Sequence, residues 1–161
     1  MHTHHYSTTV TWTGNTGNGT VEYKGYERSH IIAVDGKPPI PGSSDPSFRG
    51  DNTRYNPEEL LLAALSACHM LFFLHMCAVC GVVVTGYTDK AEGKMAEEAG
   101  GGGRFTEVTL YPVVTVKASS MIKGAMEAHQ EAAKRCFIAN SVNFPVHHNA
   151  TCISEENRQL K

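Results

Sequence analysis

The sequence predicts an α+β fold in one domain, and three observations lead to this prediction. The chain has 161 residues, which is the length of a single domain with its own core. Strand-like segments come first and are followed by one long apolar segment of helical character. A two-stranded hairpin, a second helix and a short last strand complete an order that is typical of α+β proteins. We therefore expect one domain over residues 1–161, with residues 1–5 as a loose tail.

Composition and charge argue against several classes of protein. Hydrophobic residues make up 41% of the chain and charged residues 19%, the balance of a folded globular protein. Fourteen Lys and Arg against sixteen Asp and Glu give a net charge of −2, so no basic excess favours a nucleic-acid partner. The first ten residues lack the pattern of a secretory signal peptide, and an odd number of cysteines, five, is not typical of a secreted disulfide framework. We expect a cytoplasmic protein.

The first part of the chain is expected to consist of strands and turns. Alternating residues predict a strand over 8–12, a turn cluster follows at 14–19, and the alternation resumes at 21–23. Residues 30–34 form a further predicted strand, which an Asp-Gly turn closes. Residues 37–51 hold four prolines and are expected to form a long loop, a kind of segment that often carries function.

A strong helix start follows this loop. Asn56 is a preferred N-cap residue, Pro57 is favoured at the first helical position, and Glu58 suits the positive end of the helix dipole. Asn56 and Glu59 have the spacing of a capping box. The sequence therefore predicts a helix from Pro57 to about Cys80.

This helix is apolar on nearly every side. The run over residues 60–84 is long enough to span a bilayer, but it contains His69, His75 and three cysteines and lacks basic flanks. Gly81 then interrupts it before three valines that favour a strand. We therefore predict a buried central helix and no membrane partner. Because a chain of this size cannot wrap such a helix completely, we expect a second copy to cover one of its faces.

The second half of the chain predicts a hairpin and another helix. Two strands are expected over 82–98 and 104–116, joined by a flexible loop at 100–103. A helix over about 121–138 follows, and a short strand over 148–153 precedes a charged tail. Either Ser119 or Ser120 is expected to cap the second helix, and Pro112 marks a bulge or an edge.

Two cysteines are candidates for a reactive thiol. Cys68 is near the middle of the long helix, where the helix dipole does not stabilise a thiolate, so a reactive Cys68 needs a cation from elsewhere. Cys136 lies near the end of the second helix, after Lys134 and Arg135, whose side chains point to other faces. For both cysteines, simple packing in the core is the alternative interpretation.

A third pair, Cys77 and Cys80, has the CxxC spacing. No second CxxC motif accompanies it in the sequence. His69 and His75 do not have the spacing that would complete a tetrahedral zinc site with these cysteines. Core packing is the favoured interpretation of this pair, and a zinc-binding protein that uses these cysteines and histidines is the alternative.

Together these segments resemble the OsmC/Ohr family, the osmotically inducible protein C and organic hydroperoxide resistance proteins. The resemblance is carried by NPEELLLAALSACHM, in which Cys68 follows Glu58 by ten residues, and by AAKRCFIANS around Cys136. It implies an OsmC-like α+β fold with antiparallel sheets around a long buried helix, formed as an intertwined homodimer. It also implies a thiol peroxidase that reduces organic or fatty-acid hydroperoxides.

The resemblance assigns roles to four residues. Cys68 would attack the peroxide and become a sulfenic acid, and Cys136 would condense with it to form a disulfide that an external dithiol reduces. An arginine would stabilise the thiolate, with Glu58 orienting it; Arg49 is the expected arginine and Arg54 its competitor. No cofactor and no metal are expected.

Geometry supports the homodimer. Ten helical residues separate Glu58 from Cys68 by about 15 Å, too far for one side chain to bridge. Two such helices packed antiparallel across a two-fold axis would bring Glu58 of one chain toward Cys68 of the other. Apolar side chains available to line the pocket favour alkyl hydroperoxides over hydrogen peroxide; they are Leu65, Met70, Phe72, Phe73 and Phe137. The alternative function is a non-catalytic OsmC-like dimer that binds a small hydrophobic ligand.

Overall fold

The computed structural model describes residues 2–158, without the side chains of residues 157 and 158. The chain divides into two compact units, Met1–Leu61 and Leu62–Lys161, and the boundary falls inside the long helix α1. The assignment of the whole chain to one domain stays a prediction.

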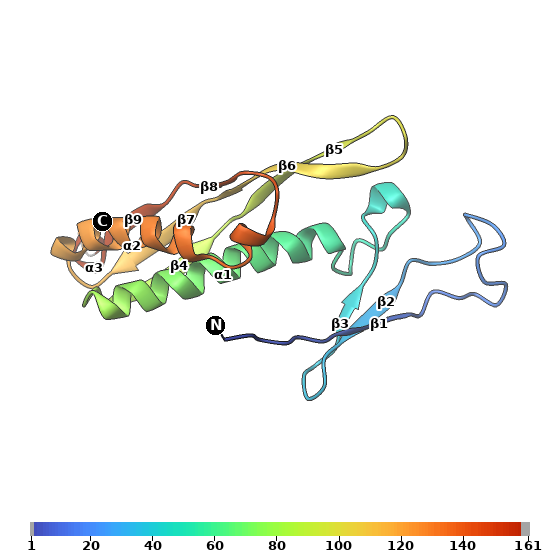
Figure 1. Ribbon diagram of the computed structural model, residues 1–161, viewed down its shortest axis with the longest axis horizontal. Helices are drawn as coiled ribbons and strands as arrows, with labels where there is room; N and C mark the ends of the chain where they lie inside the picture. Colours follow the sequence, from blue (N-terminus) through green and yellow to red (C-terminus); the bar gives the residue numbers. More distant parts are fainter. Residues whose placement is uncertain (1, 159–161) are drawn as a thin grey trace. The chain divides into compact units, whose positions relative to one another are not determined.

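The N-terminal unit is built on a three-stranded antiparallel sheet (Figure 1). Its strands are β1 (Thr9–Trp12), β2 (His30–Ala33) and β3 (Ile40–Gly42), in that order. Gly36 adopts a left-handed backbone with φ 76° in the predicted Asp-Gly turn, a conformation that glycine adopts without strain.

Two predictions for this unit were wrong. Residues 21–23 form no strand, because the segment 14–29 folds back on itself. The Trp12 indole donates to the Glu27 carbonyl, and Arg28 lies over the rings of Tyr23 and Tyr26. The predicted loop over 37–51 contains β3 and the short helix η1 (Pro46–Phe48), which the Asp45 side chain caps.

The helix α1 (Pro57–Val79) begins as predicted. The Glu59 backbone N–H donates to the Asn56 side chain at 2.8 Å, and the Asn56 N–H donates to the Glu59 carboxylate at 3.2 Å. This reciprocal pair is a capping box. The helix ends at Val79, and the φ of 72° at the following Gly81 lets the Val82 N–H reach back to the Cys77 carbonyl.

One stripe of α1 is buried, not its whole circumference. The fully buried side chains recur every fourth residue, at Leu65, His69, Phe73 and Cys77. Leu71 is 62% exposed and Val79 67% exposed. The single chain therefore leaves part of α1 uncovered, as expected for a chain of this size, and burial of that part by a second copy stays a prediction. By length and composition α1 could cross a bilayer, a test that core helices of soluble proteins also pass.

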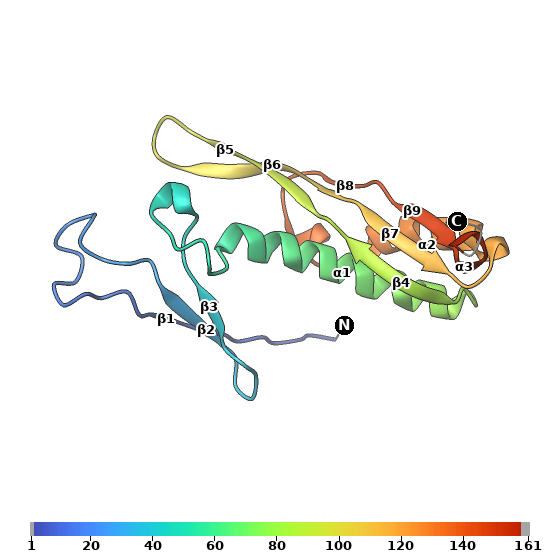
Figure 2. The same cartoon turned by 180° about the vertical axis from the view of Figure 1, so that it is seen from behind.

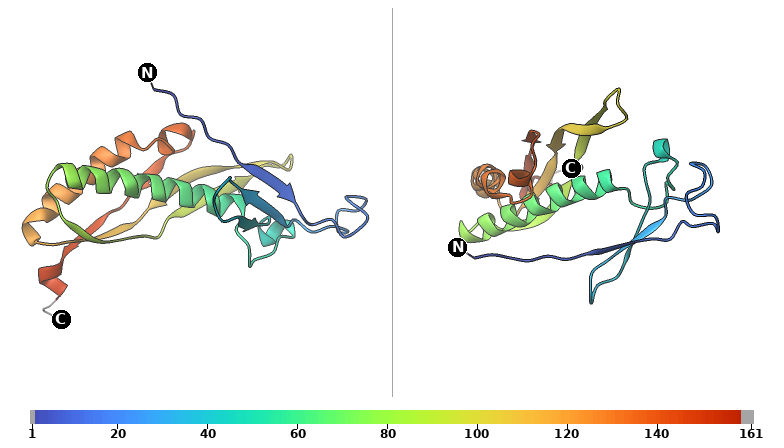
Figure 3. Two further views of the ribbon diagram at one scale, coloured as in Figure 1. Left: turned by 90° about the horizontal axis from the view of Figure 1, so that it is seen from below. Right: turned by 45° about the vertical axis from the view of Figure 1, so that its right-hand side comes forward.

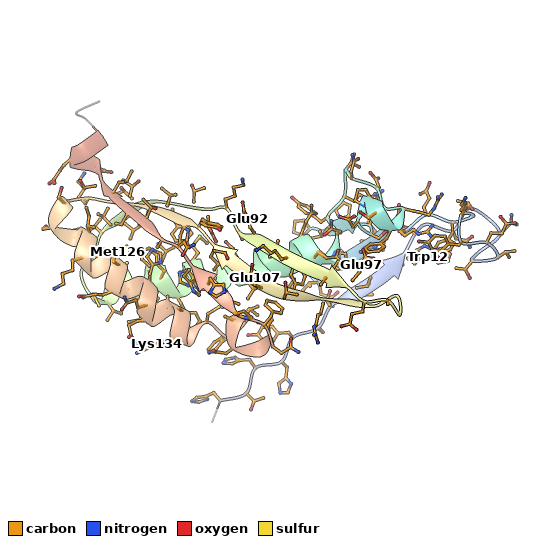
Figure 4. The ribbon with its side chains drawn as sticks, turned by 90° about the horizontal axis from the view of Figure 1, so that it is seen from above. Trp12, Glu92, Glu97, Glu107, Met126 and Lys134 are labelled. Atoms are coloured by element: carbon orange, nitrogen blue, oxygen red, sulfur yellow. The ribbon has the colours of Figure 1, made fainter. Side chains whose placement is uncertain are left out.

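The C-terminal unit contains a long hairpin that is bent into two sheets (Figure 2). One arm consists of β4 (Val84–Asp89) and β5 (Glu92–Glu97), and the other of β6 (Gly103–Leu110) and β7 (Pro112–Val116). The short strands β8 (Val146–His148) and β9 (Thr151–Ser154) join β6 and β7 in parallel, giving the orders β5-β6-β8 and β4-β7-β9. In Figure 4, Glu92 and Glu107 mark the paired strands β5 and β6.

The bend splits strands that the sequence predicted as continuous. Asp89 lies where β4 ends, and its carboxylate accepts the backbone N–H of Tyr111, the residue between β6 and β7, at 2.7 Å. A side chain thus replaces a strand as the partner of this N–H, and the ladder is interrupted there.

The second helix, α2 (Ile122–Arg135), lies beside α1 and shares its core (Figure 3). The short helix η2 (Ser119–Met121) precedes it, so the predicted serine cap was wrong. Ser119 instead donates its hydroxyl and its backbone N–H to Glu156, at the start of the terminal turn α3 (Glu155–Arg158). The helix ends at Arg135 because Cys136 takes an extended backbone; the short helix η3 (Ala139–Ser141) follows.

Candidate active site

Cys68 and Cys136 face each other between α1 and α2. Cys68 lies in the middle of α1 and is half-buried; Cys136 follows α2 directly and is 1% exposed. The two thiols are hydrogen-bonding partners, and both are free cysteines. Residues 68 positions apart in the chain are thus brought into contact (136 − 68 = 68), which is the arrangement that a disulfide requires.

The two sulfurs differ in their surroundings. Burial raises the pKa of the Cys136 thiol to about 11, and its hydrogen bond with Cys68 adds to the rise. The Ala139 N–H, 3.4 Å from Sγ, opposes the rise only in part. Cys136 also lies at the negative end of the α2 dipole, which disfavours a thiolate. Cys136 is therefore a neutral thiol near pH 7.

Two aromatic rings border the dithiol. Phe72, one turn after Cys68, meets Phe137, the neighbour of Cys136, edge to face with ring centroids 5.1 Å apart. Phe137 is 70% exposed, so an apolar surface reaches solvent beside the thiols. Leu65 and Phe73, which we expected to line the pocket, are instead fully buried in the core.

The predicted arginine and glutamate belong to the N-terminal unit. Arg49 follows η1 with a left-handed φ of 66° and lines a cavity of about 480 Å³ in that unit, together with Arg28 and Asp51. Among the described residues its guanidinium makes no hydrogen bond or ion pair. Arg54 is already paired with Asp51 at 3.3 Å. Of the two candidates, Arg49 has the cation that is free to meet another group.

Glu58 carries an unusual carboxylate. Its Oε2 atom is buried and has no hydrogen-bond partner among the described residues. Leaving a charged acceptor buried and unpaired is costly. Within the N-terminal unit no ion pair joins Glu58 to Arg49 or Arg54, so the expected orienting contact stays a prediction.

Three histidine rings, those of the buried His69 and His129 and the half-buried His148, form a cluster that sequence reasoning did not find. His69 Nε2 and His129 Nδ1 are 3.0 Å apart, with the two rings stacked at 7°. The His148 ring lies 4.4 Å from that of His69. Burial lowers the pKa of His69 to about 3 and that of His129 to about 4, so both imidazoles are neutral. The position of His129 on the apolar side of α2 was the available signal.

Of the three remaining cysteines, Cys77 and Cys152 belong to the core or its edge, and Cys80 is exposed. Cys77 is 1% exposed, and Cys152 packs against the same buried cluster. Burial raises the pKa of Cys77 to about 11, with smaller effects from Cys152 and Cys80. In the part of the chain that the structure describes, no three His, Cys, Asp or Glu side chains are arranged to hold a metal ion. Core packing is confirmed for Cys77 and wrong for Cys80, which is exposed, and the described residues give no support to the zinc interpretation.

The comparisons with known proteins identify the family and the fold of the chain. The family model described as OsmC-like protein matches residues 50–151. An OsmC-like protein of unknown function from Vibrio cholerae is 32% identical and superimposes with a TM-score of 0.83, over 92% of this chain and 100% of that one. No curated protein gives a significant match.

More distant structures share the fold. An organic hydroperoxide resistance protein from Elizabethkingia anophelis is 19% identical, with a TM-score of 0.65 over 94% of this chain and 99% of its own. A protein of the same description, OsmC, from Legionella pneumophila is 18% identical, with a TM-score of 0.64 over 91% and 96%. The fold class and the resemblance predicted from the sequence are confirmed: this chain belongs to the OsmC-like protein family.

Proposed function

We propose that this protein is a cysteine-based peroxidase that reduces organic hydroperoxides to alcohols. The observation that carries the proposal is the contact between Cys68, which is half-buried in mid-helix, and Cys136, which is buried as a neutral thiol. One sulfur is thus placed to meet a substrate and the other to meet the product formed on the first. The names of the Elizabethkingia and Legionella structures support the same chemistry.

The proposed reaction has two steps, oxidation of Cys68 and formation of the disulfide. The Cys68 thiolate attacks the terminal peroxide oxygen, the O–O bond breaks, and the alkoxide takes up a proton to leave as alcohol. Cys68 is oxidised to a sulfenic acid. The Cys136 sulfur then bonds to the Cys68 sulfur, the S–O bond breaks, and the Cys136 proton leaves with the hydroxyl as water. An external dithiol reduces the disulfide by exchange.

The substrate class follows from the surface around the thiols. Phe72 and Phe137 border the dithiol, and Phe137 is largely exposed. An alkyl chain that packs against these rings is shielded from water, which favours binding. Hydrogen peroxide has no alkyl chain and gains nothing from this surface. We therefore propose alkyl or fatty-acid hydroperoxides as substrates. If hydrogen peroxide oxidised Cys68 as fast as an alkyl hydroperoxide or faster, this choice of substrate would be wrong.

Arg49 and Glu58 complete the proposal. A thiolate in mid-helix needs a nearby cation, and Arg49 has a guanidinium without a partner in its own unit. The unpaired Oε2 atom of Glu58 is the acceptor that a guanidinium would satisfy. A second copy of the chain, packed on the exposed apolar side of α1, would supply these groups to Cys68. The active protein is accordingly proposed to be a cytoplasmic homodimer.

Thiol counting tests the proposal directly. One equivalent of an alkyl hydroperoxide should remove two of the five thiols, and mass spectrometry should find Cys68 linked to Cys136. The Cys68→Ser variant should lose no thiols, whereas the control Cys80→Ser should behave as the unaltered protein. Full retention of thiols in the unaltered protein would instead indicate a non-catalytic OsmC-like dimer that binds a small hydrophobic ligand.

A further inference from the structure

The side of α2 that faces the core is made almost entirely of alanine. Ala125, Ala128 and Ala132 pack in one cluster with Phe73 and Cys77 of α1. Alanine methyl groups do not interdigitate with their neighbours as large side chains do. Such a contact leaves the register of α2 along its axis weakly specified.

One directional contact fixes that register. His69 on α1 and His129 on α2 are joined through Nε2 and Nδ1 at 3.0 Å. His129 is also stacked on the Phe73 ring at 3.9 Å, and His148 of β8 lies against the other partner, His69. A hydrogen bond in an apolar core tolerates little displacement, and single buried polar contacts are known to set helix register.

Stability alone does not account for this pair. His69 Nδ1 and His129 Nε2 are buried and have no hydrogen-bond partner within residues 2–158. A buried polar pair with unsatisfied atoms is less favourable than apolar side chains of similar volume. The pair is therefore better explained by specificity of the helix register than by stability.

The histidines are placed to control the thiols. His69 is the next residue after Cys68, and His129 precedes Cys136 by seven residues, about two turns along the same side of α2. In a disulfide the two sulfur atoms are about 2.05 Å apart, and the two Cα atoms are about 4.4–6.8 Å apart. A slide of α2 by a single residue, about 1.5 Å, would change this approach substantially.

We propose that His69 and His129 are positioning residues that keep Cys136 in register with Cys68 and thereby set the rate of disulfide formation. The inference rests on the proposed function and deepens it. Neither imidazole takes part in the bond changes: the sulfur–sulfur bond forms, the S–O bond of the sulfenic acid breaks, and water leaves. The pair acts on the second step alone, after the hydroperoxide has been reduced.

Two variants of His129 distinguish the effect of losing the hydrogen bond from the effect of losing the aromatic ring. His129→Phe keeps an aromatic ring on Phe73 and removes the hydrogen bond, whereas His129→Asn keeps a hydrogen-bonding atom near the place of Nδ1. His75→Phe, at an exposed position of α1, is the matched control. Each variant is mixed with one equivalent of alkyl hydroperoxide and quenched at successive times with a reagent that traps sulfenic acid. Mass spectrometry then measures the sulfenic acid and the disulfide separately.

We expect His129→Phe to form the Cys68 sulfenic acid at the unaltered rate and to convert it into the disulfide about tenfold to hundredfold more slowly. His129→Asn should recover most of that loss, and His75→Phe should show none. An unchanged disulfide rate in His129→Phe, or equal slowing in both His129 variants, would overturn the inference.

A second pair of variants covers the case in which His129→Phe does not fold. His69→Gln keeps a hydrogen-bonding atom near the place of Nε2, and His69→Phe does not, so the same difference in disulfide rate is expected between them. Failure of the unaltered protein to form any Cys68–Cys136 disulfide would refute the proposed function. A normal disulfide rate in the variants would refute only the positioning role.

Discussion

Cys68 and Cys136 have the same side chain and opposite environments. The half-buried Cys68 lies where a substrate can reach it, whereas burial keeps Cys136 protonated with a pKa of about 11. A neutral second thiol does not compete for peroxide, because the thiolate is the nucleophile. The division of labour that we propose for the two cysteines therefore depends on burial and not on sequence context.

At the same scale, the two arginine candidates can be told apart. The Arg54 guanidinium is engaged by Asp51, and that of Arg49 is free among the described residues. We expect Arg49→Ala to lower the rate of Cys68 oxidation about a hundredfold, since it removes a cation that stabilises developing charge. Arg54→Ala is the matched comparison and should change the rate less than threefold. Stopped-flow measurement of peroxide consumption decides the matter, and the reverse order of effects would identify Arg54.

The helix α1 shows how local chemistry sets an element. Its start depends on side chains three positions apart, Asn56 and Glu59, which satisfy each other's backbone N–H groups. The spacing was readable in the sequence because a capping box needs no distant partner. The start of α2 was not readable, since Ser119 is bound by Glu156 from the far end of the chain.

The cap of α1 can be tested by substitution. Asn56→Ala removes the acceptor of the Glu59 N–H and should lower the free energy of unfolding by about 1 kcal/mol. Asn52→Ala, in the exposed turn before the helix, is the control and should change it by less than about 0.5 kcal/mol. Urea denaturation followed by circular dichroism measures both. Equal stability of the two variants would show that the capping box contributes nothing.

At the scale of the whole molecule, the exposed side of α1 implies a partner. A long helix with Leu71 and Val79 largely exposed leaves apolar surface that a second copy would cover. We expect sedimentation to give a dimer of twice 17.5 kDa. Leu71→Glu should shift it toward monomer and abolish turnover, whereas Lys123→Glu, at an exposed position of α2, should do neither. A fully active monomer would contradict the shared-site arrangement.

The buried histidines also govern how the molecule responds to acid. The pKa values of His69 and His129 lie at about 3 and about 4 in the folded protein, below the ordinary value of 6.5. The unfolded chain therefore binds more protons than the folded chain between those limits, and stability falls as the pH drops below 6.5. Urea midpoints from pH 7.5 to pH 5 should decline, and less steeply in His69→Gln. A flat profile would show that the histidines are not buried as neutral groups.

The sequence by itself determined the α+β order, the cap and length of α1, and the family, through the motifs around Cys68 and Cys136. These features depend on side chains close together in the chain or on motif spacing. Only the tertiary structure decided which face of α1 is buried, where Asp89 bends the hairpin, and that His69 meets His129 across 60 residues. The physical reason is that burial and pairing are properties of segments brought together by packing, and no local pattern specifies which distant segment arrives.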